Sequence, residues 1–381
     1  MRTTRLVAGQ AGALLLAVST AWAQPPSPVD IAGFYPFPGS LQSPASAASA
    51  GLALADRWLG DEPFDNPAAA PPREVALAPL LLHMSRQDLR AHNSDYDETP
   101  LFIDAAGGRL SWPLGALGLS LYACQPVLRR EDNAFIRGKA GSPVPPAELK
   151  SSSTARELRA GLALSFGRPA LRFGLAGEWT QRDDAYDYDE TSGDPASGTR
   201  HADFSGNGFG FQAGVRCEPH ARVTVGAGVR WVPALDLDGA LSQDLLLGDT
   251  TMAVTAHRKG ALEGGLSARV AVTESFRVFA SGGGRGAQEW EGFGVTAGPG
   301  ACWSVGLEFH DERDPWTARL GIGQEAQSGV PEPRATSVGV GFCWKMESIT
   351  IDVGVLRRSF QRPGKPTSYD DRVVAGVRVP I

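Results

Sequence analysis

Charged side chains that could bind an anion recur at alternate positions along this chain of 381 residues. Arg172, Arg230 and Arg319 each stand between apolar or small residues, and Glu178 and Glu308 follow the same pattern. A guanidinium group binds a carboxylate through two parallel hydrogen bonds, so these arginines could hold an anionic head group. The alternative, which the neighbouring carboxylates favour, is ion pairing that holds parts of the protein together.

Sequence motifs of enzymes and of metal sites are missing. The six histidines form no HExxH pattern, the serines form no GxSxG pattern and the four cysteines form no CxxC pair. The glycine run Gly282–Gly286 is not followed by the GK[ST] of a phosphate-binding loop. A net charge of −6 argues against a nucleic-acid partner. We therefore expect no enzyme activity, no cofactor, no resident metal ion and no nucleic-acid binding.

One acidic motif, Asp-Tyr-Asp-Glu-Thr, occurs at Asp95–Thr99 and again at Asp187–Thr191. We expect both copies in loops at the outer end of the protein. Clustered carboxylates suit Ca²⁺ or Mg²⁺, whereas acidic loops that are simply solvated explain the same residues and are the interpretation that we favour.

The first 23 residues have the pattern of an export signal. Arg2 and Arg5 supply a basic start, Ala11–Val18 is an apolar core, and Ala21-Trp22-Ala23 fits a cleavage site. An uncleaved N-terminal membrane anchor is the alternative. The sequence thus predicts three parts: a signal peptide at 1–23, a segment rich in Pro, Ala and Ser at 24–73, and a β-rich part at 74–381.

Hydrophobicity in the third part alternates with a period of two, which is typical of β-strands with one apolar face. In the segment 223–231, the odd positions are Val, Val, Ala, Val and Trp, while the even positions are Thr, Gly, Gly and Arg. Such stretches run for about 10 to 14 residues, whereas strands of soluble proteins usually have about 5 or 6. A strand that crosses a bilayer obliquely needs about 9 to 11. A soluble β-sandwich is the alternative that the strand length disfavours.

Fourteen segments show this alternation, and the connections between them are long and short in turn. An up-and-down transmembrane barrel has this arrangement, with long loops outside and short turns inside. We therefore predict an all-β fold: a transmembrane antiparallel β-barrel of about 14 strands with an N-terminal plug. The predicted strands are 75–84, 101–112, 116–128, 155–167, 169–182, 205–217, 220–232, 261–272, 274–286, 299–310, 314–326, 334–345, 347–360 and 370–381.

The fourth long connection, 233–260, is rich in leucine. Leu237, Leu241 and Leu245 repeat every four residues, as on one face of a helix. Together with Leu246 they could form an apolar surface that captures a substrate, or the helix could pack on its own barrel. The segment Thr250–His257 also alternates, but a further strand would give an odd total, so we assign it to the same loop.

The predicted plug resembles a known family. An Ala-rich segment at Ser46–Asp56 is followed by the acidic pair Asp61-Glu62, then by Phe64, and then by Asn66-Pro67-Ala68. This order is similar to the hatch of outer-membrane transporters for long-chain fatty acids and aromatic hydrocarbons (the FadL type). The resemblance implies a barrel of 14 strands with the hatch, here residues 24–73, inside it.

The resemblance also implies a gate. In that family the hatch element that matches Asn66, Pro67 and Ala68 lies beside a kinked third strand that opens the wall laterally. The third predicted strand contains Pro126, which cannot donate a backbone hydrogen bond. Pro126 could mark such a break, or it could simply end the strand near the outer rim.

The sequence thus predicts a passive transporter for hydrophobic small molecules in the outer membrane of a Gram-negative bacterium. Outer loops would capture the substrate, and release would be lateral or gated by the hatch. The expected partners are membrane lipids and lipopolysaccharide, the hydrophobic substrate and the barrel assembly machinery, with the chain as a monomer. The alternative is a general diffusion porin, or a structural or adhesive barrel without a specific substrate.

Overall fold

A computed structural model describes the residues on which the following sections rest. They are 56–59, 62–69, 73–87, 102–137, 147–191, 198–245, 248–292, 295–310, 315–328, 334–361 and 368–381. The predicted signal peptide at 1–23, the whole segment 24–55, Leu246 and the first acidic motif lie outside them. No helix in these ranges is long and apolar enough to cross a membrane.

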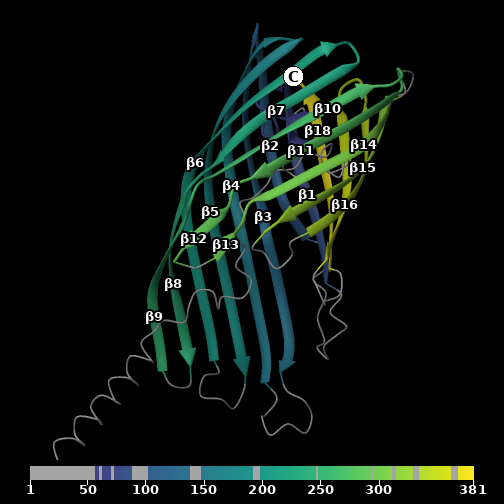
Figure 1. The fold of residues 1–381 in the computed structure, drawn as a ribbon. Coiled ribbons are helices and arrows are strands. Elements are labelled where there is room, and N and C mark those ends of the chain that lie inside the picture. Colours follow the sequence, from purple (N-terminus) through teal and green to yellow (C-terminus); the bar gives the residue numbers. More distant parts are fainter. Residues whose placement is uncertain are drawn as a thin grey trace, which may run out of the picture.

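The described chain is built almost entirely of antiparallel strands, with one short 3₁₀ helix near its start (Figure 1). The elements are η2 (Asp56–Leu59), β1 (Glu74–Gln87), β2 (Phe102–Leu114), β3 (Leu117–Arg137), β4 (Ala147–Arg168), β5 (Leu171–Thr191), β6 (Gly198–His220), β7 (Val223–Val232), β8 (Leu235–Leu245), β9 (Gly248–Arg258), β10 (Ala261–Ala271), β11 (Phe276–Arg285), β12 (Gln288–Glu291), β13 (Val295–Ala297), β14 (Gly300–His310), β15 (Trp316–Gln327), β16 (Arg334–Lys345), β17 (Thr350–Gln361) and β18 (Ser368–Pro380).

These strands form one closed ring. Strand β1 pairs with β2 on one side and with the last strand, β18, on the other. The sheet has 18 strands, but four pairs of consecutive elements, β7/β8, β9/β10, β11/β12 and β13/β14, each continue one wall strand, and 18 − 4 = 14. The prediction of about 14 strands is therefore confirmed, and ring closure leaves the wall without an edge where it crosses a bilayer.

The four divided wall strands are each interrupted by two residues: Pro233-Ala234, Lys259-Gly260, Gly286-Ala287 and Gly298-Pro299. Pairing resumes in the same register, since Val232 pairs with Ala261 below the break and Leu235 with Arg258 above it. The inward face changes from even to odd numbers in the first strand, from Arg230 to Leu235. Each interruption shifts the alternation by one position. Against β6 the first interruption is a β-bulge, because Trp231 pairs with Phe211 but Asp238 pairs with Ser205, which gives β7/β8 one residue more than β6 over this stretch. The interruptions that face each other keep register, and we call all four bulges.

Several segments that we expected in loops are strands. Strands β3, β4, β5 and β6 extend well beyond their predicted ends, and they take up most of 129–154 and 183–204. Figure 1 shows β3–β6, β8 and β9 reaching beyond the other strands at the end away from the C-terminus, which we call the distal end. The loop predicted at 233–260 was wrong, because β8 and β9 form a hairpin there.

The outward face changes character along each long strand. On β5, Leu171, Phe173 and Leu175 are exposed. Beyond Trp179, the outward positions of the same strand carry polar residues such as Asp183 and Asp187. An exposed apolar band with aromatic residues at its border is the surface that suits hydrocarbon and its interface. The band therefore marks the part of the barrel that spans a membrane, and the distal part of β3–β6, β8 and β9 projects beyond it.

A pair of arginine substitutions on one face of β6 locates this border. Phe211 lies in the apolar band and is 64% exposed, whereas Ser205 lies six residues nearer the distal end on the same outward face. We expect Phe211→Arg to destabilise the barrel in lipid vesicles by roughly 2–4 kcal/mol and Ser205→Arg by about 0–1 kcal/mol. Urea titration, followed by the heat-modifiable mobility of the folded barrel on gels, measures both. Equal effects would mean that the band does not face lipid.

Candidate functional site

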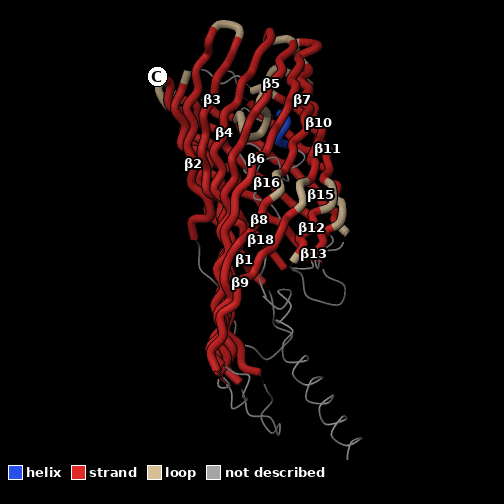
Figure 2. Tube along the Cα trace, turned by 90° about the vertical axis from the view of Figure 1, so that its left-hand side faces the viewer, coloured by secondary structure: helices blue, strands red, loops and turns tan. Residues whose placement is uncertain are grey.

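Residues 56–59 and 62–69 lie against the inward face of the wall, and Figure 2 shows η2 between strands near β7 and β10. Glycines make this approach possible. The carbonyl oxygen of Trp58 lies 1.9 Å from the position that a Cβ on Gly226 would occupy, and its ring lies 2.2 Å from that on Gly228. A larger residue at either glycine would collide with Trp58, so β7 is shaped to receive this segment.

Asn66 folds the segment into a compact turn. Its Nδ2 donates to the carbonyl oxygens of Trp58 at 2.7 Å and Val215 at 3.3 Å, and its Oδ1 accepts from the amide of Ala68 at 2.9 Å. Pro67 and Ala68 lie over Gly174 of β5. The element predicted at Asn66, Pro67 and Ala68 is therefore buried, and it contacts β5 and β6.

Two further contacts attach this segment to the wall. Glu62 accepts a hydrogen bond from Arg109 of β2 at 2.6 Å, and Arg109 also pairs with Glu74 of β1. Phe64 packs edge-on against Tyr122 of β3, with ring centroids 5.9 Å apart. Since both carboxylates and the guanidinium are buried, the segment is held by charge pairing in a site closed to water.

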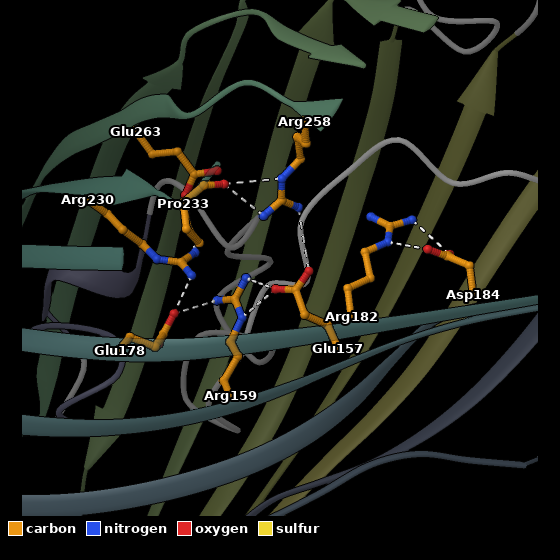
Figure 3. A network of polar contacts seen from close by, with 9 residues as sticks. All are labelled: Glu157, Arg159, Glu178, Arg182, Asp184, Arg230, Pro233, Arg258 and Glu263. Carbon is orange, nitrogen blue, oxygen red and sulfur yellow. Dashed lines mark hydrogen bonds and ion pairs between the residues drawn. The ribbon is translucent and has the colours of Figure 1, made fainter. Parts of the chain in front are cut away.

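A network of ion pairs runs along the inward face (Figure 3), and Tyr122 of β3 adds a hydrogen bond to it. Tyr122 donates to Glu178 at 3.2 Å, and Glu178 also accepts from Arg230 at 2.6 Å. Arg230 reaches Glu263 of β10 at 3.5 Å, and Arg159 lies 3.5 Å from Glu178. The network thus links strands β3, β4, β5, β7 and β10.

The network continues toward the distal end through Glu157. Arg159 donates to this carboxylate at 2.8 and 2.6 Å, and Arg258 lies 3.7 Å from it while donating to the carbonyl of Pro233. Arg182 and Asp184 form a neighbouring pair at 2.7 Å. We call the following the central polar network: Glu157, Arg159, Glu178, Arg182, Asp184, Arg230, Arg258 and Glu263.

Four arginines and four carboxylates make this network electrically balanced. The arginine side chains are between 0% and 3% exposed. Buried charges are tolerated only when they are paired, because an isolated one would lose its hydration without compensation. The network therefore fills this part of the inward face with buried ion pairs.

Apolar side chains cover the inward face on the distal side of the network. Trp290 of β12 is fully buried and stands at the boundary, where the guanidinium carbons of Arg182 and Arg258 lie over its ring at 5.1 and 5.5 Å. Burial raises the pKa of Tyr186, and Tyr188 is packed beside the group. We call these residues the distal apolar cluster: Tyr186, Ala202, Phe204, Leu237, Leu241, Ala256 and Trp290.

Two of the leucines predicted for substrate capture belong to this cluster. Leu237 and Leu241 are buried on the inward face of β8, and Leu237 packs over Gly206. The predicted helix was wrong, because a spacing of four residues also places side chains on one face of a strand. Leu245 ends β8, where its backbone pairs with Gly198, and Leu246 lies outside the described residues.

The three arginines singled out in the sequence have different surroundings. Arg230 belongs to the central polar network. Arg319 donates to Glu308 at 2.8 Å near the end with the short turns. Arg172 stands directly opposite Arg216 on the neighbouring strand. The structure does not gather these arginines into one site, and two of them pair with carboxylates of the wall.

Pro126 lies inside β3 and does not end it, because the strand continues to Arg137. Its backbone stands opposite Ala105 of β2. On the other side, pairing with β4 passes from Cys124 directly to Val127, and the register shifts between Val127 and Arg129. The wall is thus irregular beside Pro126, between β3 and β4.

The second acidic motif is part of β5 rather than of a loop, so its predicted placement was wrong. On the outward face, Asp187 accepts from one ring nitrogen of His201 at 2.7 Å and Asp203 lies 2.6 Å from the other. These hydrogen bonds raise the pKa of His201. Across the described ranges, no group of His, Cys, Asp and Glu side chains is arranged to hold a metal ion.

Sequence reasoning missed Trp290 and Arg258, which join the network to the cluster. Both fell in segments that we assigned to loops, 287–298 and 233–260. The signal was present, since Leu235, Leu237 and Leu241 alternate with polar residues and Arg258 ends a second alternating run. The bulges hid it, because the alternation changes phase at each of them.

Known proteins resemble this chain in structure. No family model matches it, and no curated protein matches its sequence. The Pseudomonas putida toluene transporter TodX is similar with a TM-score of 0.64 at 13% identity, over 91% of this chain and 100% of TodX. A Pseudomonas aeruginosa FadL homologue gives 0.63 at 14%, over 90% and 99%. The monoaromatic hydrocarbon channel CymD gives 0.59 at 14%, over 90% and 98%. The chain therefore has the fold of the FadL-type barrels.

Removing one carboxylate tests whether the network is a buried ion-pair system. Glu178→Ala would leave Arg159 and Arg230 without their shared partner, so we expect a loss of roughly 3–5 kcal/mol in the free energy of unfolding. Tyr122→Phe removes only a hydroxyl that donates to the same carboxylate, and we expect a loss of about 1 kcal/mol. Urea titration in lipid vesicles measures both. A loss for Glu178→Ala no larger than for the control would contradict the pairing.

Proposed function

We propose that this chain is an outer-membrane transporter that takes up hydrophobic small molecules passively through a plugged barrel. The observation that carries the proposal is the distal apolar cluster on the inward face. Leu237 and Leu241 lie there beside Phe204, whereas the wall below them carries charged side chains. A pore for ions and polar solutes has no use for such a surface, but an apolar molecule that leaves water gains about 25 cal/mol per Å² of area buried against it.

The charge-paired inward face supports a selective route over an open pore. Arg159, Arg182 and Arg258 are at most 1% exposed, and each is held by a carboxylate or by a backbone carbonyl. Hydrated ions would need to break these pairs or to pass around them. This disfavours the general diffusion porin that the sequence left open.

The N-terminal segment supplies the plug in this proposal. Glu62, Phe64 and Asn66 attach it to strands on different parts of the wall through an ion pair, an aromatic contact and a hydrogen bond of their side chains. Such contacts can break and form again without unfolding the barrel. A release path beside Pro126, where the pairing of β3 with β4 is irregular, is the proposed lateral alternative to a passage past the plug.

The proposed location in the outer membrane is supported by the exposed apolar band of the barrel and by the similar transporter structures. The apolar band fits a bilayer, and the predicted signal peptide at 1–23 directs export. TodX is a toluene transporter and CymD a monoaromatic hydrocarbon channel by name, which supports transport over catalysis for a chain of the same fold. The proposed partners are outer-membrane lipids and lipopolysaccharide, the apolar substrate and the barrel assembly machinery, and the proposed state is a monomer.

Deletion of the plug tests the first half of the proposal. Removing 24–73 takes away the partners of Arg109 and Tyr122 but no wall strand. We expect a folded barrel whose single-channel conductance in planar bilayers is at least several-fold above that of the full chain, because the lumen of a 14-stranded barrel is too wide for wall side chains alone to fill. Unchanged conductance in a folded deletion variant would show that the segment does not block the lumen.

A pair of aspartate substitutions in β8 tests the second half. Leu241 belongs to the buried cluster, and its neighbour Ala240 is exposed on the outward face. We expect Leu241→Asp to lower the uptake of radiolabelled toluene or oleate by Gram-negative cells about tenfold, since a carboxylate in the apolar cluster is costly to desolvate. Ala240→Asp should leave uptake as it is. If both variants fold and take up both compounds normally, the cluster is not on the route.

A further inference from the structure

Trp290 stands where the distal apolar cluster meets the central polar network. Its ring is fully buried, it belongs to the cluster, and the guanidiniums of Arg182 and Arg258 lie over it at 5.1 and 5.5 Å. The ring therefore closes the apolar side with an aromatic surface that two cations contact. Cations attract the face of an aromatic ring, and most strongly that of tryptophan.

Oxygen atoms hold both guanidiniums from their edges. Asp184 accepts from Nε and Nη2 of Arg182 at 2.7 and 3.0 Å. The carbonyl of Pro233 accepts from Nε and Nη2 of Arg258 at 3.3 and 3.1 Å, and Glu157 lies on its remaining side at 3.7 Å. A planar guanidinium held at its edge presents a flat face to an aromatic ring. Both arginines are thus oriented as receptors for a ring.

The strand that carries Trp290 is short and has few pairing positions. Strand β12 has four residues, pairs with β9 only at Trp290 and Glu291, and pairs with β13 at three positions. It follows the bulge at Gly286-Ala287, ends at Glu291 and is followed by Gly292, which has a φ of 89°. Short segments with few ladder hydrogen bonds open at lower free energy than long strands. The ring can therefore leave its place while the wall stays closed.

We propose that Trp290 gates the passage between the cluster and the network, and that a substrate passes by putting its own aromatic ring over Arg182 and Arg258. This rests on the proposed transport function and narrows its substrate class to molecules that carry an aromatic ring. An aromatic substrate replaces the indole face by an equivalent one, so the buried cations keep their partner throughout. A saturated ring of the same size offers no such face and leaves them uncovered.

The selectivity is tested with two substrates of similar size, toluene and methylcyclohexane. Radiolabelled compounds are supplied to Gram-negative cells that express the full chain, and uptake is taken relative to cells without it. We expect the intact protein to take up toluene roughly tenfold faster than methylcyclohexane, which gives a ratio of about ten. The double variant Arg182→Met with Asp184→Asn removes one cation together with its partner and should bring that ratio to about threefold or lower.

The gate is tested by the same uptake ratio, because the plug is present in every variant and affects both compounds. Trp290→Leu should raise the uptake of methylcyclohexane several-fold and bring the ratio to about threefold or lower, because leucine is smaller and has no aromatic face, whereas Trp290→Phe should keep the ratio near that of the intact protein. Trp303→Leu is the matched control, since Trp303 is an exposed tryptophan on the outward face of β14. Heat-modifiable mobility shows that each variant is folded, so the leucine and phenylalanine variants decide the question even if the double variant does not fold.

The outcomes separate the two proposals. Uptake of both compounds at equal rates by the intact protein would overturn the aromatic gate and leave the transport function standing. Uptake of neither compound nor of oleate would overturn the transport function and this inference with it. A ratio of toluene to methylcyclohexane uptake in Trp290→Leu as high as in the intact protein would show that Trp290 is not a gate.

Discussion

The need to pair every backbone amide in a surrounding without water governs the rest of this structure. An unpaired amide in hydrocarbon costs several kcal/mol, so a sheet can cross a bilayer only as a closed ring. The pairing of β1 with β18 provides that closure. Once the ring is closed, each wall residue has one of two surroundings. The outward face carries Leu, Phe and Trp for lipid, and the inward face must find partners within the lumen.

The lumen of a ring of 14 strands is too wide for wall side chains to fill. Among the described residues, the N-terminal segment and the long arginine side chains of the wall occupy this space. Glycines such as Gly174 and Gly226 let the backbone of 56–59 and 62–69 approach the wall closely. Long arginine side chains span from strand to strand and are neutralised by carboxylates. An apolar filling of the same volume could be as stable, so the charged one suggests a role in deciding what passes.

The sequence predicted the ring well and its distal part badly, and one physical cause explains both. The predicted strands 220–232, 261–272, 274–286 and 299–310 stop within two residues of a bulge, because the alternation changes phase there. Beyond the bulges, the outward face is polar and the inward face is apolar. This is the reverse of the pattern of the transmembrane strands, so we assigned these segments to loops. Thr250–His257 alternates as a strand should, but an added strand made the total odd. The number of wall strands stays even because β8 continues β7 and β9 continues β10.

The contact of Trp290 with Arg182 and Arg258 could not have been predicted by any pattern within one segment. It joins residues of β12, β5 and β9, and it depends on register across two bulges. Had those bulges been absent, the even-numbered Arg258 and Trp290 would face outward, because Glu263 of β10 and Phe279 of β11 set odd positions inward. The bulges therefore turn a charged and an aromatic residue from the outer surface into the lumen. The two-residue interruptions, rather than the strands on either side, give the distal wall its distinct inner surface.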